Sequence, residues 1–360
     1  MLSYFLKFSA IYILNLFVEA VGDLYVEQLS AEQARHWIDV IQRIPANRNK
    51  LPQFRDKTVD ELLTISDTYE AVSISTSKDY LQVSKAAFTW AVQRKYLANN
   101  VLKDMLITAK PKKISKESEM RRRFTQEDLD NIFSLPRFRE GDYSRTYYCW
   151  FPLLGLYTGA RAEELAQLEL QDIYKEKNVW VMNINDLGDK KLKTINAHRI
   201  VPIHKTLIKL GFIKYVEFLK QCFESGVTCK NKLFPELEKQ RDGYSRKPRD
   251  RFISFLEQNN LKQEGQAFHS FRHTFADIMK QDDIPEVYCA ALIGHKHSNI
   301  TYGRYGKEFS PDKTQKIINS INPLPDSVVK KIKPFVFPAE FKLNTMCTKL
   351  MKMVDKKKCW

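Results

Sequence analysis

Three short β-rich runs inside an otherwise helical chain limit the possible folds more than any other feature of this sequence. They are LELQDI at residues 168–173, NVWVMNIN at 178–185 and AHRIVPI at 197–203. Alternating and β-branched residues of this kind predict strands, and the Gly- and Lys-rich segment DLGDKKLKTINAHR between the last two predicts a hairpin turn. Because the strands are few and short and helical patterns lie on both sides, we expect a mainly α fold with one small antiparallel β-sheet, not a doubly wound one.

The region before this sheet has the spacing of amphipathic helices from about residue 23 to residue 107. In SAEQARHWIDVIQRI, Ser30 predicts the N-cap of a helix. A second helix is expected in STSKDYLQVSKAAFTWAVQRKYL, with basic residues along its outer face. A basic helical face suits a DNA clamp, and an ordinary solvated helix surface explains it equally well. The expected apolar faces are Ala34, Trp37, Ile38 and Ile41 in the first helix, and Tyr80, Leu81, Ala87, Phe88, Ala91 and Val92 in the second.

The first 22 residues allow two interpretations. Lys7, a short apolar run and then small residues faintly resemble a signal peptide, but the run contains Asn15 and is too short for a membrane span. The alternative, which we favour, is a helix of the first domain. Its expected apolar face is Ile11, Ile13, Leu14, Phe17 and Val18.

The middle of the chain predicts a linker followed by a second helical region. Proline, lysine, arginine and serine in AKPKKISKESEMRRR mark a tether that either lies along phosphates or is simply solvated. Thr125 then predicts a helix N-cap, with Asp128 in the first turn. Residues 147–169 read as helical and apolar with TGAR in the middle, and helices resume from about Leu207.

Length and charge indicate the class of protein. A chain of 360 residues is long enough for two domains, and its formal net charge of +15 favours a polyanionic partner, nucleic acid before anionic membrane. A ribosomal-type or merely basic protein has the same balance. The six cysteines form no CxxC pair and no disulfide-scaffold spacing, which indicates a reducing cytoplasm.

A group of cationic and aromatic residues predicts phosphate chemistry. His269, Arg272, His295 and Tyr305 stand close together near the C-terminal end, and Arg161 lies far upstream. Two arginines can clamp a phosphodiester and favour a phenolate, and a histidine moves protons near neutral pH. Taken singly, these residues are more often a salt-bridged arginine, structural histidines and a half-buried aromatic.

A zinc site is the competing interpretation. His269 and His273 are four residues apart, which is the spacing of helical zinc ligands. However, Ser270 stands where the zincin pattern needs glutamate, and Arg272 between the histidines would repel a cation. We therefore expect no metal and no cofactor.

Four strings resemble the catalytic segments of the tyrosine recombinase, or phage integrase, family. They are YTGARAEELAQLELQDI, KLKTINAHRIVPIH, FHSFRHTFA and LIGHKHSNITYGRY, in the family's order, and the resemblance covers about residues 124–307. It implies a helical N-terminal core-binding domain followed by a catalytic domain. It also implies a role for each matched residue: Arg161 and Arg272 as phosphate clamps, Glu164 as their support, His269 as proton shuttle, His295 as hydrogen-bond donor to the phosphate, Lys193 as the acid for the leaving 5′ oxygen, and Tyr305 as nucleophile.

Two of these assignments have close rivals. Lys190 and Lys191 are neighbours of Lys193 and could be mistaken for the family's lysine. The distance to Val201 and Pro202 favours Lys193. Tyr302 is the nearest rival of Tyr305, but the family's spacing from the Gly-His pair fits Tyr305. His273 matches no catalytic position and is expected to be a structural helix residue.

The resemblance implies the reaction and its partners. Tyr305 would form a 3′-phosphotyrosyl bond with double-stranded DNA, for integration or excision of a mobile element. A homotetramer would act on DNA, with or without DNA-bending accessory proteins, in a cytoplasmic, nucleoid-associated setting and with no membrane. The rival functions are type IB topoisomerase-like relaxation and non-catalytic DNA binding.

The expected organisation has four parts. Residues 1–112 form a helical DNA-clamp domain, 113–123 a basic linker, 124–323 the catalytic domain and 324–360 a basic C-terminal tail. In similar enzymes a C-terminal segment docks on a neighbouring protomer, so the tail either docks in this way or is a disordered basic end.

Overall fold

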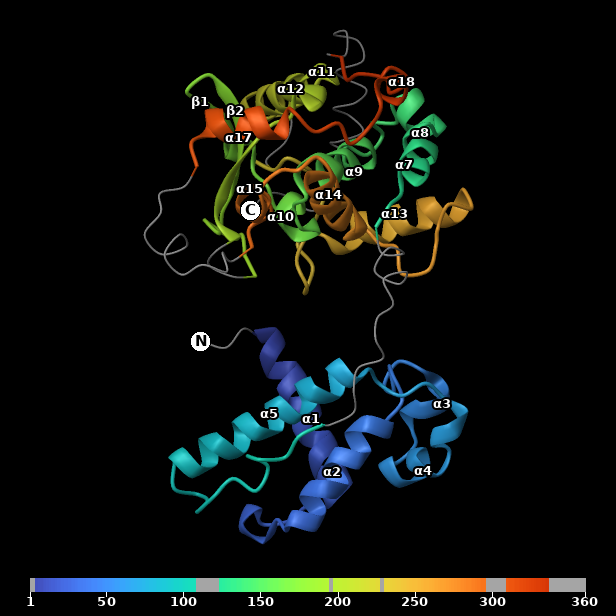
Figure 1. The fold of residues 1–360 in the computed structure, drawn as a ribbon, viewed down its shortest axis with the longest axis vertical. Helices are drawn as coiled ribbons and strands as arrows, with labels where there is room; N and C mark the ends of the chain where they lie inside the picture. Colours follow the sequence, from blue (N-terminus) through green and yellow to red (C-terminus); the bar gives the residue numbers. More distant parts are fainter. Residues whose placement is uncertain (1–3, 108–122, 194–196, 227–229, 296–308, 337–360) are drawn as a thin grey trace. The chain divides into compact units, whose positions relative to one another are not determined.

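A computed structural model describes residues 4–107, 123–193, 197–226, 230–295 and 309–336. The chain forms two compact units, residues Met1–Ile114 and Ser115–Trp360, which are described separately. Both are helical, and the second contains a three-stranded antiparallel sheet (Figure 1). The predicted fold class, mainly α with one small antiparallel sheet, is confirmed. Most of the predicted linker and the last part of the predicted tail lie outside the described residues.

The first unit is built on three longer helices, of which α2 illustrates how the sequence sets the ends. Ser30 caps α2 as predicted: its Oγ accepts from the backbone N–H of Gln33, whose side chain accepts from the backbone of Ser30. Trp37 and Ile41 are fully buried on the predicted face. The helices are α1 (Tyr4–Val21), η1 (Val26–Gln28), α2 (Ala31–Arg43), α3 (Pro52–Arg55), α4 (Val59–Thr64), η2 (Ser66–Thr68) and α5 (Ile74–Gln93).

The expectation of a helix at the start of the chain is confirmed by α1, but its predicted apolar face is partly wrong. Ile13, Leu16 and Phe17 are buried against α2 and α5 at the spacing of one helix face. Ile11 and Val18, expected on that face, are 54% and 45% exposed. Among the helices of the described residues, none is long and apolar enough to cross a membrane.

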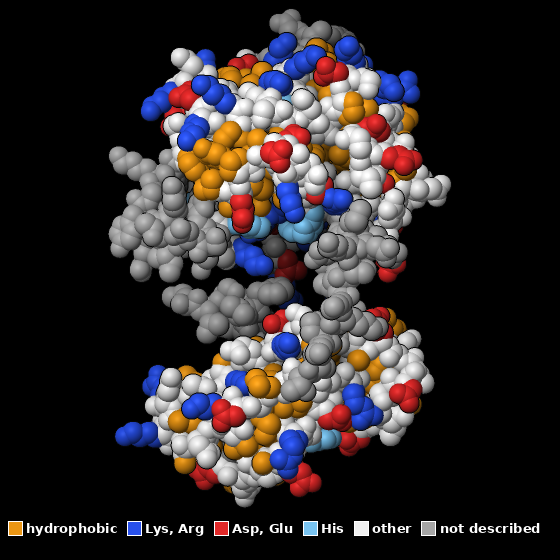
Figure 2. All heavy atoms as spheres, viewed as in Figure 1, with side chains coloured by type: hydrophobic (Ala, Val, Ile, Leu, Met, Phe, Trp, Pro, Cys, Tyr) orange, Lys and Arg blue, Asp and Glu red, His pale blue; other side chains and the backbone are white. Residues whose placement is uncertain are grey.

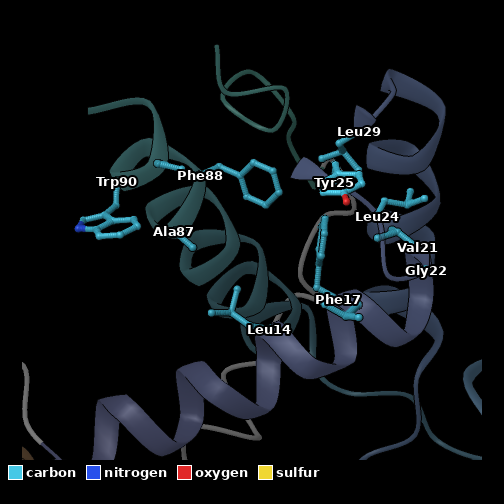
Figure 3. Close-up of a pocket in the computed structure, with 12 residues that line it drawn as sticks. Leu14, Phe17, Val21, Gly22, Leu24, Tyr25, Leu29, Ala87, Phe88 and Trp90 are labelled. Atoms are coloured by element: carbon cyan, nitrogen blue, oxygen red, sulfur yellow. The ribbon is translucent and has the colours of Figure 1, made fainter. Parts of the chain in front are cut away.

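An open apolar groove runs between α1 and α5 in the first unit (Figure 3). Phe17 and Phe88 line its interior, and Tyr25 and Trp90 lie at its exposed margin. Its lining contains no charged side chain. The groove is therefore an apolar surface, and no lysine or arginine of its lining could bind a phosphate.

The second unit is organised around one central helix, α9, whose residues are nearly all buried. A helix that is apolar on every side belongs inside a core, and α9 contacts α8, α10, α11, α13 and α14. Thr125 caps α7 as predicted, with Asp128 completing the capping box. The helices are α7 (Gln126–Phe133), α8 (Pro136–Arg139), α9 (Tyr147–Thr158), α10 (Ala162–Ala166), η3 (Leu170–Asp172), α11 (Lys205–Lys209), α12 (Phe212–Glu224), α13 (Arg246–Gln258), α14 (Ser270–Gln281), α15 (Glu286–Ile293), α17 (Pro311–Ile318) and α18 (Asp326–Val329).

The sheet has the order β1-β2-β3, with both pairs antiparallel. β2 (Val179–Ile184) and β3 (Arg199–Pro202) lie within the predicted runs, but the first predicted strand is displaced. β1 is Ile173–Glu176, because Leu170–Asp172 forms a 3₁₀ turn in which Asp172 accepts from the backbone N–H of Glu169. The alternating residues 169–172 therefore form a capped turn, and the strand begins only after it.

The predicted tail is wrong for residues 324–335, which belong to the core of the second unit. Leu324, Val328, Ile332 and Phe335 are buried there. The backbone N–H of Phe335 donates to the carbonyl oxygen of Leu210 at 2.8 Å. The apolar residues of this segment pack on the same chain, which the basic composition of the C-terminal region did not indicate.

Candidate phosphate-binding site

The TGAR string forms a sharp turn that begins the site. Residues 147–169 were predicted to be helical, but the helix stops at Gly159, whose φ of +60° is in the left-handed region that favours glycine. A Cβ at Gly159 would also lie 2.8 Å from a ring carbon of Phe275. The turn directs the chain so that Arg161 stands at the start of α10.

Arg161 is held by a carboxylate one turn further along the chain. Its Nη1 donates to Oε1 of Glu164 at 2.7 Å, and its backbone N–H donates to Oε2 at 2.9 Å. Glu164 is buried, whereas the Arg161 side chain is 23% exposed. The carboxylate therefore fixes the guanidinium from the protein side and leaves part of it open to solvent.

Arg199 is a second partner of Glu164 and was not singled out from the sequence. Its Nη2 donates to Oε2 of Glu164 at 2.7 Å, and the side chain is almost fully buried. A signal was present: Arg199 alternates with Val201 in β3, so both point to the buried face. A charged residue at an inward strand position needs a buried partner, and Glu164 is that partner.

Arg272 enters the same region from α14. Phe271 and Phe275 are fully buried on this helix, which packs against α9. Arg272 Nη1 donates to the carbonyl oxygen of Gly159 at 2.8 Å. Its Nη2 is buried and has no hydrogen-bond partner among the described residues. A buried donor without a partner is costly, and here it marks a position for an acceptor.

The charges of these groups do not balance. Arg161, Arg199 and Arg272 influence one another electrostatically, and Glu164 is the carboxylate that faces them. Burial, followed by the charges of Arg161 and Arg199, lowers the pKa of Arg272 to about 10. Burial alone would raise the pKa of Glu164, but Arg199 and Arg161 outweigh it and lower that pKa. Three guanidiniums against one carboxylate leave an excess of positive charge that suits an anion.

His269 precedes α14 and lies within this positive field. Partial burial, followed by the charges of His273, Arg272, Arg161 and Lys193, lowers the pKa of His269 to about 4. The imidazoles of His269 and His273 meet edge to face, with ring centres 4.9 Å apart. The same field opposes a metal cation, and the described residues contain no group of three or more His, Cys, Asp or Glu arranged to hold one.

His295 follows the end of α15, which terminates at Gly294 with a φ of +72°. Its side chain is exposed, and burial of one side followed by the charges of Arg272, Arg161 and Arg199 lowers the pKa of His295. His295 is thus electrically coupled to both arginines that the sequence singled out. Histidine side chains lie beside Lys and Arg side chains on the surface of the second unit (Figure 2).

The three candidate lysines in the hairpin after β2 have different surroundings. Lys190 is buried, and its Nζ lies 2.8 Å from both carboxylate oxygens of Asp172. The backbone of Lys191 exchanges two hydrogen bonds with the side chain of Gln167. Lys193 is exposed, and its charge contributes to the lowered pKa of His269. Lys190 is a structural ion-pair residue, whereas Lys193 is exposed and influences His269 electrostatically.

Tyr305 and its rival Tyr302 lie outside the described residues. The structure brings together Arg161, Glu164, Lys193, His269, Arg272 and His295, which the sequence predicted as one site, and adds Arg199. Their roles in a reaction remain predictions.

Comparisons with known proteins agree with this fold. Residues 122–310 match the model of the phage integrase family. The Tn1549 transposon integrase in complex with circular intermediate DNA is similar with a TM-score of 0.53 and 16% identity, over 88% of this chain and 93% of that chain. A lambda integrase tetramer bound to a Holliday junction is similar with a TM-score of 0.53 and 15% identity, over 83% and 74%. No curated protein matches the chain.

At these identities the structural likeness shows the fold alone. The family model, however, spans more than half of the 360 residues. The chain belongs to the phage integrase family of tyrosine recombinases.

Proposed function

We propose that this protein is a site-specific DNA recombinase that cuts and rejoins strands through a 3′-phosphotyrosyl intermediate on Tyr305. The substrate is double-stranded DNA, and the biological reaction is integration or excision of a mobile element. Arg161 and Arg272 clamp the phosphate, Lys193 serves as the acid for the leaving oxygen, His269 moves a proton and His295 donates to the phosphate.

The excess positive charge around Arg272 carries this proposal. Arg161 and Arg272 come from segments far apart in the sequence, yet Glu164 and the carbonyl oxygen of Gly159 hold them beside one another. The Nη2 of Arg272 has no hydrogen-bond partner within the described part of the chain and needs an acceptor. A phosphodiester supplies acceptor oxygens and negative charge together, and its transition state has more charge on those oxygens than its ground state.

Tyr305 is the group proposed to attack this phosphate, because the family's spacing from the Gly-His pair fits Tyr305 and not Tyr302. The histidine of that pair is His295, which follows α15.

The reaction conserves a phosphoester bond. The phenol oxygen of Tyr305 bonds to phosphorus while the bond from phosphorus to the 5′ oxygen breaks, and Lys193 gives a proton to that oxygen. In the reverse step a 5′ hydroxyl attacks the phosphotyrosyl bond and releases the phenol. Because the bond energy stays in the covalent intermediate, strand joining needs no nucleotide hydrolysis.

His269 is suited to accept the phenol proton once DNA is bound. With its pKa at about 4, the imidazole is neutral at physiological pH. A phosphodiester between the arginines offsets the positive field and raises the pKa of His269 towards neutrality. The base therefore gains strength when the substrate arrives.

The remaining partners follow from charge and from the relatives. Lys78, Arg94 and Lys95 are exposed on or beside α5, which suits a DNA-clamping role for the first unit. Lambda integrase forms a tetramer on a Holliday junction, and we extend a homotetramer on DNA to this chain. DNA-bending accessory proteins remain part of the proposal.

Covalent trapping tests the function. Nicked duplexes tiled across the DNA that flanks the coding region are incubated with the purified full chain, and adducts are resolved on a denaturing gel. A nick near the cleavage site lets the short 5′ product diffuse away, so the intermediate accumulates. We expect an adduct with the wild type and with Tyr302→Phe, and none with Tyr305→Phe.

Two other outcomes support the rival functions. Adducts on every duplex, together with plasmid relaxation at any sequence, would indicate a topoisomerase-like enzyme. Specific DNA binding with no adduct on any nicked duplex would leave a DNA-binding protein and overturn the proposal.

A further inference from the structure

Arg199 connects three segments of the site through one buried guanidinium. Its Nη2 donates to Oε2 of Glu164 at 2.7 Å, its Nε to the carbonyl oxygen of Leu292 at 2.6 Å, and its Nη1 to that of Ala197 at 2.8 Å. Glu164 belongs to α10, Leu292 to α15 and Ala197 to the end of the hairpin that carries Lys193. Three of its five N–H donors are used within the protein and the side chain is only 6% exposed, so we treat Arg199 as a structural group and not as a phosphate ligand.

The carboxylate of Glu164 is divided between two arginines. Arg161 takes Oε1 at 2.7 Å, and Arg199 takes Oε2 at 2.7 Å. This division fixes the plane of the carboxylate and therefore the direction from which Arg161 is held. Without Arg199 the carboxylate could turn about its last bond, and Arg161 would turn with it.

The end of α15 rests on the same guanidinium. A Cβ at Gly294 would lie 2.7 Å from Nη1 of Arg199 and 3.3 Å from the Cα of Ala197. His295 follows directly. The turn that presents His295 is thus set by direct packing on Arg199 as well as by the hydrogen bond to Leu292.

We propose that Arg199 is a positioning residue of this site, which orients Arg161 through Glu164 and places His295 through the end of α15. The inference rests on the proposed function and deepens it. Arg199 acts without touching DNA, and its effect passes through the two groups that it holds.

The test compares Arg199→Met and Arg199→Lys with the wild type, each also combined with Glu164→Gln. The rate of adduct formation on the nicked duplex identified above is measured from pH 5 to pH 9 (a range chosen around neutrality), together with DNA affinity and thermal midpoint. We expect Arg199→Met to slow adduct formation about 10²-fold, with little change in DNA affinity. Arg199→Lys keeps the charge but not all three bonds, and we expect about a 10-fold loss.

The shape of the pH profile separates positioning from general damage. Glu164 is faced by Arg161 from its own segment, by Arg199 from β3, by Arg272 from α14 and by His295 after α15. Arg199→Met removes the charge that most strongly offsets the burial of Glu164. The pKa of Glu164 therefore rises, and the acid limb of the pH profile moves to higher pH. Arg199→Lys restores the limb, and Glu164→Gln abolishes the shift.

An Arg199→Met profile with the same acid midpoint as the wild type would overturn the inference. The inference would also fail if Arg199→Met slowed adduct formation by the same factor in the Glu164→Gln background as in the wild type. Equal factors would show that Arg199 and Glu164 act independently. If Arg199→Met does not fold, Arg199→Lys decides, and an unchanged rate would sink the idea. Absence of an adduct with the wild type would instead overturn the proposed function, and this inference with it.

Discussion

The guanidinium of Arg272 donates to the carbonyl oxygen of Gly159 at 2.8 Å, across 113 residues of sequence. The contact joins the turn that presents Arg161 to the helix that carries Arg272. It forms because Gly159 ends α9 in a left-handed conformation, which points its carbonyl oxygen to the start of α14. This hydrogen bond from the Arg272 side chain to the backbone therefore helps to set the spacing of the two arginines.

Gly159→Ala should disrupt this turn. The backbone conformation costs a non-glycine residue about 1–3 kcal/mol, and the new Cβ would meet Phe275 at 2.8 Å and Ile293 at 3.0 Å. Gly226→Ala is a matched control, because Gly226 has a φ of +71° and no atom of the described residues lies within 4 Å of its Cβ position. Chemical denaturation should show a larger loss at Gly159. Equal losses would mean that the packing around the turn contributes nothing.

Lys190 and Lys193 should respond differently to substitution by methionine. Lys190→Met leaves the buried carboxylate of Asp172 without its main cation, which destabilises a protein by about 3–5 kcal/mol. Lys193→Met should leave the free energy of unfolding unchanged within about 0.5 kcal/mol and slow cleavage.

A modified substrate identifies the step that Lys193 serves. A duplex with sulfur in place of the bridging 5′ oxygen has a leaving group that needs no proton. This substrate should restore cleavage by Lys193→Met. Cleavage by Arg272→Lys should stay slow on the same substrate. Failure of the sulfur substrate to rescue Lys193→Met would contradict the role of Lys193 as acid.

His204 should make stability depend on pH. It is fully buried: its Nδ1 accepts from the backbone N–H of Thr206, and its Nε2 donates to the carbonyl oxygen of Ile321. Burial lowers the pKa of His204 to about 4. Because the unfolded chain takes up this proton near pH 6.5, the stabilisation is complete above that pH and is lost as the pH falls towards 4.

The size of this effect is measurable. The shift corresponds to about 3 kcal/mol, so the free energy of unfolding should fall by that order between pH 7 and pH 4. Denaturation curves of wild type and His204→Gln, taken at several pH values, should converge at low pH. A constant difference between them would show that the protonation of His204 is not coupled to folding.

The end of the folded core of the second unit can be located by truncation. Removal of residues 337–360 keeps every residue of the described core and serves as the reference. Removal of residues 324–360 takes away the buried Leu324, Val328, Val329, Ile332 and Phe335. Each contributes about 1.5–3 kcal/mol, so the shorter chain should not fold. A cooperative, wild-type-like unfolding curve for it would show that this segment is peripheral.

The sequence predicted the fold class because helix caps and strand runs are local patterns. The grouping of the site residues was predicted from four strings that resemble the family's segments. Ser30 and Thr125 identified helix starts through capping chemistry, and β-branched runs identified β2 and β3. Arg199 was missed because its meaning depends on Glu164, which lies 35 residues earlier. No local pattern shows that an arginine in a strand meets a carboxylate from another element.

The errors have a similar cause. The first strand was displaced because Asp172 caps a turn instead of continuing the alternation. Residues 324–335 are predicted as part of a basic tail because the stretch from Lys330 onward contains many lysines. Their apolar residues instead pack in the core of the second unit, where Phe335 contacts Tyr215 and Phe218 of α12.

The central claim concerns which atom bonds to DNA, and peptide mapping of the trapped adduct tests it most directly. The adduct is digested with protease and nuclease, and the nucleotide-bearing peptide is sequenced by tandem mass spectrometry. We expect a 3′-nucleotide on the phenol oxygen of Tyr305. A nucleotide on Tyr302, or on any other residue, would contradict it.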